Sequence, residues 1–308
     1  MFKHIFNDDV SLHHGIPKCY SHFKDKKFKD WEIAPWELYI DSNNLLGEGS
    51  WAKVYLAEWR HTTVVAKVLK NQLDLHAKEL IIKEFNNMTK MHHPNIVQLF
   101  GYIEEPFTII MEYFQNGDLY SNLNKLKINQ KIKIAYDIIK GLIYLHERRP
   151  NSLIHRDIKL RNILLTNSYT AKIADFGLST FNIENIIKTV SNDNLQELEK
   201  LENIDLNSND SSKQYTKEVG TERYMAPEII TGKYNELVDI YSCGILYYEL
   251  FSNNLFNYKF HFNNFSTSLK ELINKMTVNN PDDRIKAIEV LNLLNITKFS
   301  QRKFKLLF

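Results

Sequence analysis

The chain has 308 residues, of which 44% are hydrophobic and 25% charged, and its formal net charge is +2. These fractions are those of an ordinary globular protein, and so small a charge excludes nucleic acid or an anionic membrane as the main electrostatic partner. The two cysteines, Cys19 and Cys243, lie far apart, which excludes a disulfide framework and favours a reducing compartment. No apolar run approaches the roughly 18 residues that a membrane-spanning helix requires, and the first residues lack the apolar core of a signal peptide. We therefore expect an intracellular, cytoplasmic protein without a membrane span.

The first third of the chain favours strands. Residues 1–38 show no hydrophobic period and are assigned to an N-terminal extension. β-branched and aromatic residues then gather at 54–56, 63–66 and 107–110, which predicts three strands. Apolar residues at helical spacing predict one helix among them, at 80–88.

Helical patterns dominate the rest of the chain. Apolar residues recur at helical spacing over 132–145, and the apolar stretch 236–251 predicts a buried helix. Strands followed by helices predict an α+β chain with two lobes, a small one at 39–112 and a larger one at 113–308. Residues 182–213 are rich in Asn, Ser, Asp and Glu and lack aromatics, so we expect a mobile low-complexity insert.

A short glycine-containing turn precedes the first predicted strand. Gly47 and Gly49 would let backbone amides approach a phosphate without a side chain in the way. The next position where a glycine is typical carries Ala52. Alone, this pattern also fits an ordinary hairpin turn, but the strand that follows it argues against a dinucleotide-binding fold and a Walker loop.

Lys67 follows two apolar residues in the next strand. An ammonium group that is partly buried is costly unless it is paired, and Glu84 on the predicted helix is the natural partner. The alternative for a lone lysine in a strand is an exposed edge position.

The third motif carries most of the chemistry. The stretch His-Arg-Asp-Ile-Lys-Leu-Arg-Asn at 155–162 is followed by Asp-Phe-Gly at 175–177. Two carboxylates and an amide in this order meet the needs of phosphoryl transfer, since Asp157 can orient a hydroxyl while Asn162 and Asp175 hold magnesium. A chance match to one short string is plausible, but a match to all of them in order is not.

Together these motifs resemble the eukaryotic-type protein kinase family from about residue 40 to 300. Lys159 and Thr221 follow the Ser/Thr pattern, and the sequence around Trp59 is similar to the tyrosine-kinase-like branch of the Ser/Thr kinases. The resemblance implies a two-lobed kinase fold, transfer of the γ-phosphoryl group of ATP to protein substrates, and Mg²⁺ as cofactor, with Mn²⁺ as a substitute. It implies neither a substrate identity nor an oligomeric state.

The resemblance also assigns roles to individual residues. The catalytic residues would be Lys67, Glu84, Asp157 and Lys159, and the metal ligands Asn162 and Asp175. The ATP-binding residues come from the glycine-containing turn, the adenine pocket and the hinge: Leu46, Gly47, Glu48, Gly49, Ser50, Trp51, Ala52, Lys53, Val54, Ala66, Lys67, Met111, Glu112, Tyr113, Phe114 and Leu164.

Further landmarks concern the second lobe. The resemblance predicts a buried ion pair between Glu228 and Arg284 and predicts that Asp239 braces the catalytic loop. The stretch 251–269 is shorter than in the family, so a helix usual there is expected to be reduced or missing. Two rival readings remain: a catalytically silent kinase-like scaffold, which loss of Lys67, Asp157 or Asp175 would indicate, and a small-molecule kinase. All three of those residues are retained.

Overall fold

The computed structural model describes residues 29–49, 52–70, 85–149, 152–181, 222–232, 234–263 and 265–295. The chain divides into two compact units, Met1–Gln115 and Asn116–Phe308, close to the boundary expected between the lobes. The first unit is built on a β-sheet and the second is mainly helical, which confirms the predicted two-lobed α+β fold. The expected insert at 182–213 lies outside the described residues.

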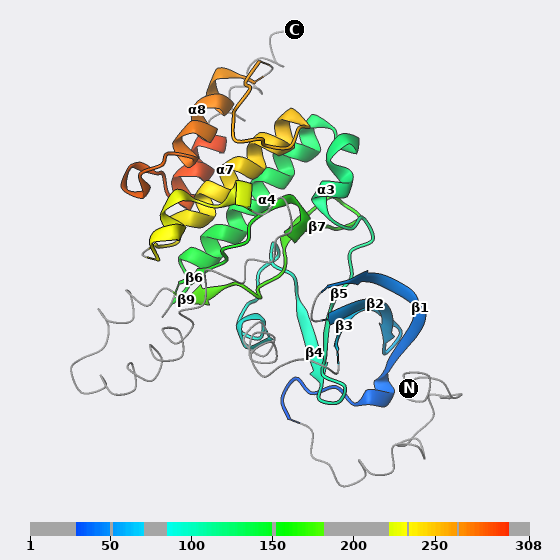
Figure 1. Cartoon of the computed structure of the whole chain (residues 1–308). Coiled ribbons are helices and arrows are strands. Elements are labelled where there is room, and N and C mark those ends of the chain that lie inside the picture. The colour runs from blue at the N-terminus through cyan, green and yellow to red at the C-terminus, as the bar shows by residue number, and fades with distance from the viewer. Residues whose placement is uncertain are drawn as a thin grey trace, which may run out of the picture. The chain divides into compact units, whose positions relative to one another are not determined.

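The first unit contains a five-stranded antiparallel sheet in the order β1-β2-β3-β5-β4, drawn in blue and cyan in Figure 1. Its strands are β1 (Leu38–Glu48), β2 (Ala52–Trp59), β3 (Thr62–Leu69), β4 (Leu99–Ile103) and β5 (Thr108–Glu112). The three strands predicted from the sequence are therefore confirmed. Of the predicted helix, residues 85–88 are helical, and the earlier turns lie outside the described residues.

The two predicted ATP-binding residues of strand β3, Ala66 and Lys67, lie on opposite faces of the sheet. Val64, Ala66 and Val68 alternate along it and belong to the hydrophobic core, as the two-residue period of a strand requires. Val65 and Lys67 therefore face the opposite side and are only half-buried.

Part of the segment assigned to the N-terminal extension packs on this sheet. The backbone N–H of Ile33 donates to the Tyr102 carbonyl at 2.7 Å, and Tyr102 N–H donates to the Trp31 carbonyl at 2.8 Å. A Cβ atom at Gly101 would lie 2.5 Å from the Trp31 carbonyl oxygen, so this close approach requires glycine. The first unit thus includes residues that precede the predicted lobe boundary.

The described part of the second unit combines helices with two small sheets (Figure 1). The helices are α3 (Leu119–Asn122), α4 (Ile128–His146), α7 (Leu237–Ser252) and α8 (Thr267–Met276), and residues 287–295 are also helical. Strand β6 (Leu153–Ile154) pairs with β9 (Thr180–Phe181), and β7 (Ile163–Leu165) pairs with β8 (Ala171–Ile173).

Helices α4 and α7 form the core of this unit, and both confirm the sequence patterns that predicted them. The fully buried face of α4 recurs at helical spacing and comprises Ile134, Ala135, Ile138, Ile139, Leu142 and Leu145. Nearly every residue of α7 is buried. The hydroxyl of Tyr247 on α7 donates to the Ala135 carbonyl on α4 at 2.6 Å, so the two helices share a polar contact within their apolar interface.

No helix occurs among the described residues between α7 and α8, which confirms the expected reduction of this stretch. Aromatic side chains of the connection gather on Tyr248 of α7 instead: Phe256, Phe260, Phe262 and Phe265. In the described ranges, no helix has the length and apolar character needed to cross a membrane.

Candidate active site

The segment between β6 and β7 holds the carboxylate of Asp157 in a fixed orientation. The side chain of Asp157 is 7% exposed, and its Oδ2 atom lies 2.9 Å from the Lys159 ammonium. Asn162 donates from Nδ2 to the same oxygen at 2.7 Å and to the Asp157 carbonyl at 2.8 Å. Both side-chain contacts fall on Oδ2, so neither occupies Oδ1.

Burial raises the pKa of Asp157 above its ordinary value, although the ammonium of Lys159 acts in the opposite direction. The negative charge of Asp175 adds to the increase. Because a carboxylate with a raised pKa binds a proton more readily, the environment makes Asp157 a better proton acceptor than an exposed aspartate.

His155 connects this segment to the Asp-Phe-Gly motif. Its Nδ1 atom accepts from the Asp157 N–H at 3.2 Å, so Nε2 carries the proton and donates to the Ala174 carbonyl at 3.0 Å. Its ring lies edge-on to Phe176 with centroids 4.9 Å apart. The histidine thereby fixes the position of the residues immediately before and after Asp175.

Asp239, at the beginning of α7, binds the backbone of the same segment, as predicted. Its carboxylate is fully buried and accepts from the backbone N–H groups of His155 and Arg156, both at 2.8 Å, and from His146 Nε2 at 2.9 Å. Arg156 has a φ of 67°, a left-handed conformation that costs free energy in a non-glycine residue. The bonds to Asp239 hold the backbone in this conformation.

Burial alone would raise the pKa of Asp239, but the hydrogen bond and electrostatic attraction from His146 and the contact with His155 outweigh it. The pKa of Asp239 therefore lies below its ordinary value, and the group carries its charge in the folded protein.

The predicted metal ligands have the donor chemistry that magnesium requires. Asn162 uses Nδ2 for both bonds to Asp157. Neither bond involves the side-chain oxygen Oδ1, which is the atom that would bind a cation. Asp175 is exposed, and its φ of 65° sets it in a strained backbone. Ala174 N–H donates to the Asn162 carbonyl at 2.9 Å, so a backbone bond joins the two segments. An amide oxygen and an exposed carboxylate fit a hard cation.

The glycine-containing turn lies between β1 and β2 in the first unit. Gly49 N–H donates to the Ala52 carbonyl at 2.9 Å, which makes the turn tight. Ala52 is buried and pairs with Leu69 in the sheet. Ser50 and Trp51 lie outside the described residues.

Two predicted ATP-binding residues, Glu48 and Lys53, belong to a surface ion cluster. The Glu48 carboxylate lies 2.7 Å from Lys70 Nζ and 3.7 Å from Lys53 Nζ. The hydrogen bond from Lys70 is the main cause of a lowered pKa at Glu48.

Lys67 occupies the middle of the sheet in the same unit. It lies on β3 opposite Val54 of β2 and Ile109 of β5. Its predicted partner, Glu84, lies outside the described residues. Of the predicted hinge, Phe114 is buried, while Met111, Glu112 and Tyr113 are half-buried. The predicted site residues therefore divide into two sets: Leu46 to Phe114 belong to the first unit, and Asp157 to Asp175 to the second.

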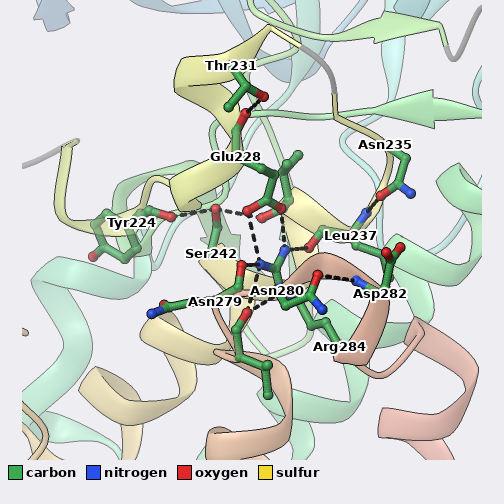
Figure 2. A network of polar contacts seen from close by, with 12 residues as sticks. Tyr224, Glu228, Thr231, Asn235, Leu237, Ser242, Asn279, Asn280, Asp282 and Arg284 are labelled. Atoms are coloured by element: carbon green, nitrogen blue, oxygen red, sulfur yellow. Dashed lines mark hydrogen bonds and ion pairs between the residues drawn. The ribbon is translucent and has the colours of Figure 1, made fainter.

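Glu228 and Arg284 point toward each other in the second unit (Figure 2), as predicted. Glu228 belongs to the 3₁₀ turn Pro227–Thr231, and Arg284 follows the 3₁₀ turn Pro281–Asp283. The guanidinium also donates to the carbonyls of Leu237 and Val278, so its donors are satisfied on several sides.

The structure adds contacts that the sequence patterns did not predict. Arg156 donates from Nε to the Leu178 carbonyl at 2.5 Å and from Nη1 to the Tyr234 hydroxyl at 2.7 Å. His146 is the second unpredicted partner, through its bond to Asp239. These contacts join residues far apart in sequence, so a local sequence pattern cannot predict them.

The chain is similar to known protein kinases. A family described as protein kinase domain matches residues 40–294. The chain is 36% identical over 249 residues to serine/threonine-protein kinase VIK of Arabidopsis thaliana. The aligned region covers 75% of this chain and 51% of that protein. It is 32% identical to serine/threonine-protein kinase CTR1 of the same plant, over 70% of this chain and 24% of the relative. It is also 32% identical to dual specificity protein kinase pyk3 of Dictyostelium discoideum, over 82% and 18%. The chain therefore matches about half of the first of these relatives and about a quarter or less of the other two.

Proposed function

Because the chain belongs to the protein kinase family, we propose that it transfers the γ-phosphoryl group of ATP to serine or threonine hydroxyls of protein substrates. The observation that carries this proposal is the constrained carboxylate of Asp157, with Lys159 and Asn162 both bonded to Oδ2. The names of the relatives support serine and threonine as acceptors.

In the proposed reaction, Asp157 accepts and orients the proton of the substrate hydroxyl through Oδ1. The hydroxyl oxygen forms a bond to the γ-phosphorus while the bond between that phosphorus and the bridging oxygen of ADP breaks. Lys159, beside Asp157, would stabilise the negative charge of the group being transferred.

The first unit would bind the rest of the nucleotide. Backbone amides of the turn around Gly47 and Gly49 and the ammonium of Lys67 would contact its phosphates. Asn162 and Asp175 would hold Mg²⁺, which neutralises phosphate charge when bound.

A transfer assay tests the proposal. Purified protein would be incubated with radiolabelled ATP, magnesium and a generic protein substrate, beside the variant Asp157→Asn and the control Asp41→Asn, which changes a half-buried aspartate of β1. We expect label in the substrate with the wild type and the control, and a loss of about 100-fold or more with Asp157→Asn. Equal rates in all three proteins, with unchanged melting, would refute the site. An inactive wild type would support the alternative of a silent scaffold.

A further inference from the structure

Two arginines of the second unit, Arg161 with an exposed side chain and Arg223 with a side chain that is 19% exposed, lie against aromatic rings. Arg161 follows Asp157 by four residues, and its side chain is exposed at the 3₁₀ turn Leu160–Asn162. Its guanidinium carbon lies 4.3 Å from the ring centroid of Tyr120 on α3. This cation–π contact restricts the arginine to one place on the surface.

Arg223 provides the second positive charge. It belongs to the 3₁₀ turn Glu222–Tyr224, and its guanidinium lies 5.1 Å from the Tyr224 ring centroid. Its pKa is raised above the ordinary value even though burial acts to lower it, because Tyr224, Glu249 and Tyr120 all act to raise it. Tyr120 therefore lies within the electrostatic reach of both arginines.

The carboxylate that pairs with Arg223 also accepts hydrogen bonds from other groups of the protein. Glu249 has no exposed side-chain surface, and its Oε1 atom lies 3.0 Å from Arg223 Nε. The same oxygen accepts from the Phe256 N–H at 2.8 Å, and Oε2 accepts from the Tyr224 hydroxyl. A buried carboxylate with these partners cannot bind a basic side chain of a substrate. It also balances only one of the two guanidinium groups.

The other acid beside α3 is similarly engaged. Asp118 caps the N-terminus of α3 by accepting from the Ser121 N–H at 2.7 Å. Within the described part of the chain, the Arg161 guanidinium contacts the ring of Tyr120. An arginine stacked on an aromatic ring keeps its N–H donors in the plane of the guanidinium, where they can bind a carboxylate or phosphate.

We propose that Arg161, stacked on Tyr120 and supported by the charge of Arg223, selects substrates with an acidic or phosphorylated residue near the serine or threonine acceptor. This inference rests on the proposed kinase function, since the acceptor must reach Asp157. Basic residues at the same substrate position are repelled by the like charge of the Arg161 guanidinium.

Matched peptides test the inference. Each peptide carries one acceptor serine in a neutral background, and one flanking position at a time is changed to Glu, phosphoserine, Gln or Lys. Comparing the phosphoserine and Glu peptides shows whether the site prefers a phosphate or a carboxylate. For the wild type we expect kcat/KM at the best position to be about five- to tenfold higher for Glu than for Gln, and lowest for Lys. The preference should shrink as salt concentration increases.

Three variants and a control assign the preference to residues. Arg161→Gln should reduce the Glu-to-Gln ratio of kcat/KM to near one, and Arg161→Glu should reverse the order of the Glu and Lys peptides. Tyr120→Leu should weaken the ratio because the arginine loses its ring. Arg149→Gln, which changes an exposed arginine after α4, should leave the ratio as in the wild type.

Binding of the same peptides, measured by fluorescence anisotropy, separates this inference from the proposed function. A chain that transfers no phosphate but binds the Glu peptide more tightly than the Lys peptide would refute the function and keep the anionic site. Transfer or binding that does not distinguish Glu from Lys, or that Arg161→Gln leaves unchanged, would overturn the inference.

Discussion

Glu228 and Arg284 form a bidentate ion pair that joins two turns 56 residues apart, with Nη1–Oε1 at 2.5 Å and Nη2–Oε2 at 3.1 Å. The side chain of Arg284 has no exposed surface, and that of Glu228 is 10% exposed. Figure 2 shows that carbonyls around the guanidinium take up its other donors. The pair therefore anchors the turn Pro227–Thr231 to the helical core.

Removing Arg284 should destabilise the second unit strongly. Arg284→Met would leave a carboxylate and several carbonyls without donors in a buried place, so we expect a loss of about 3–5 kcal/mol. The matched control is Lys29→Met, because Lys29 lies 3.4 Å from Glu104 in an exposed pair, and it should cost less than about 1 kcal/mol. Chemical unfolding of both variants gives the comparison, and equal losses would contradict the structural role of the buried pair.

Asp239→Asn should reduce both stability and transfer. The amide cannot accept from all of the donors that surround Asp239, namely His146 and two backbone N–H groups, so we expect a loss of about 2–3 kcal/mol near neutral pH. Transfer should fall as well, because Arg156 loses the contact that holds its backbone. Melting and the transfer assay at neutral pH measure the two effects.

The stability effect of Asp239 should also depend on pH in a defined direction. The folded-state pKa of Asp239 is lowered, so its stabilisation is fully present above the unfolded pKa of about 3.9 and is lost as the pH falls through the folded pKa. The difference between wild type and Asp239→Asn should therefore be largest near neutral pH and shrink below about pH 4. A difference that stays constant down to pH 3 would contradict this assignment.

Lys159→Met should move the acid limb of the pH–rate profile to higher pH. Burial raises the pKa of Asp157, and the Lys159 ammonium limits that increase. Removing the ammonium should raise the pKa of Asp157 further, so that a larger share of Asp157 is protonated at a given pH. The residual kcat/KM measured across pH reports the midpoint. Lys140→Met, on the exposed side of α4, should keep the wild-type midpoint, and an unchanged midpoint in Lys159→Met would argue against Asp157 as the titrating base.

Lys67→Met should remove transfer activity without unfolding the first unit. Lys67 is half-buried on β3, where a methionine fills similar space beside Val54 and Ile109, so melting should change little. The phosphate contact proposed for Lys67 would be lost. Lys70→Met breaks the exposed pair with Glu48 near the end of the same strand and should keep activity. Similar activity in both variants would place the phosphate contact elsewhere.

The sequence by itself determined the features that local order encodes. β-branched residues over 63–66 predicted a strand, and helical spacing over 132–145 predicted the buried stripe of α4, because that period follows from backbone geometry. The motif at 155–162 places Asp157, Lys159 and Asn162 within six consecutive residues. Asp239 and the pair of Glu228 with Arg284 came from the family resemblance, not from spacing.

Only the tertiary structure decided contacts between distant segments. It brought Tyr234 to Arg156 across 78 residues and His146 to Asp239 across 93, and it stacked Arg161 on Tyr120. It also packed Trp31 to Ile33 beside β4, where Gly101 allows the close approach. Such contacts depend on how whole elements pack, and the residues involved share no period or motif. The motifs of the sequence therefore predicted the residues of the candidate site, whereas the packing of whole elements determined which distant residues contact them.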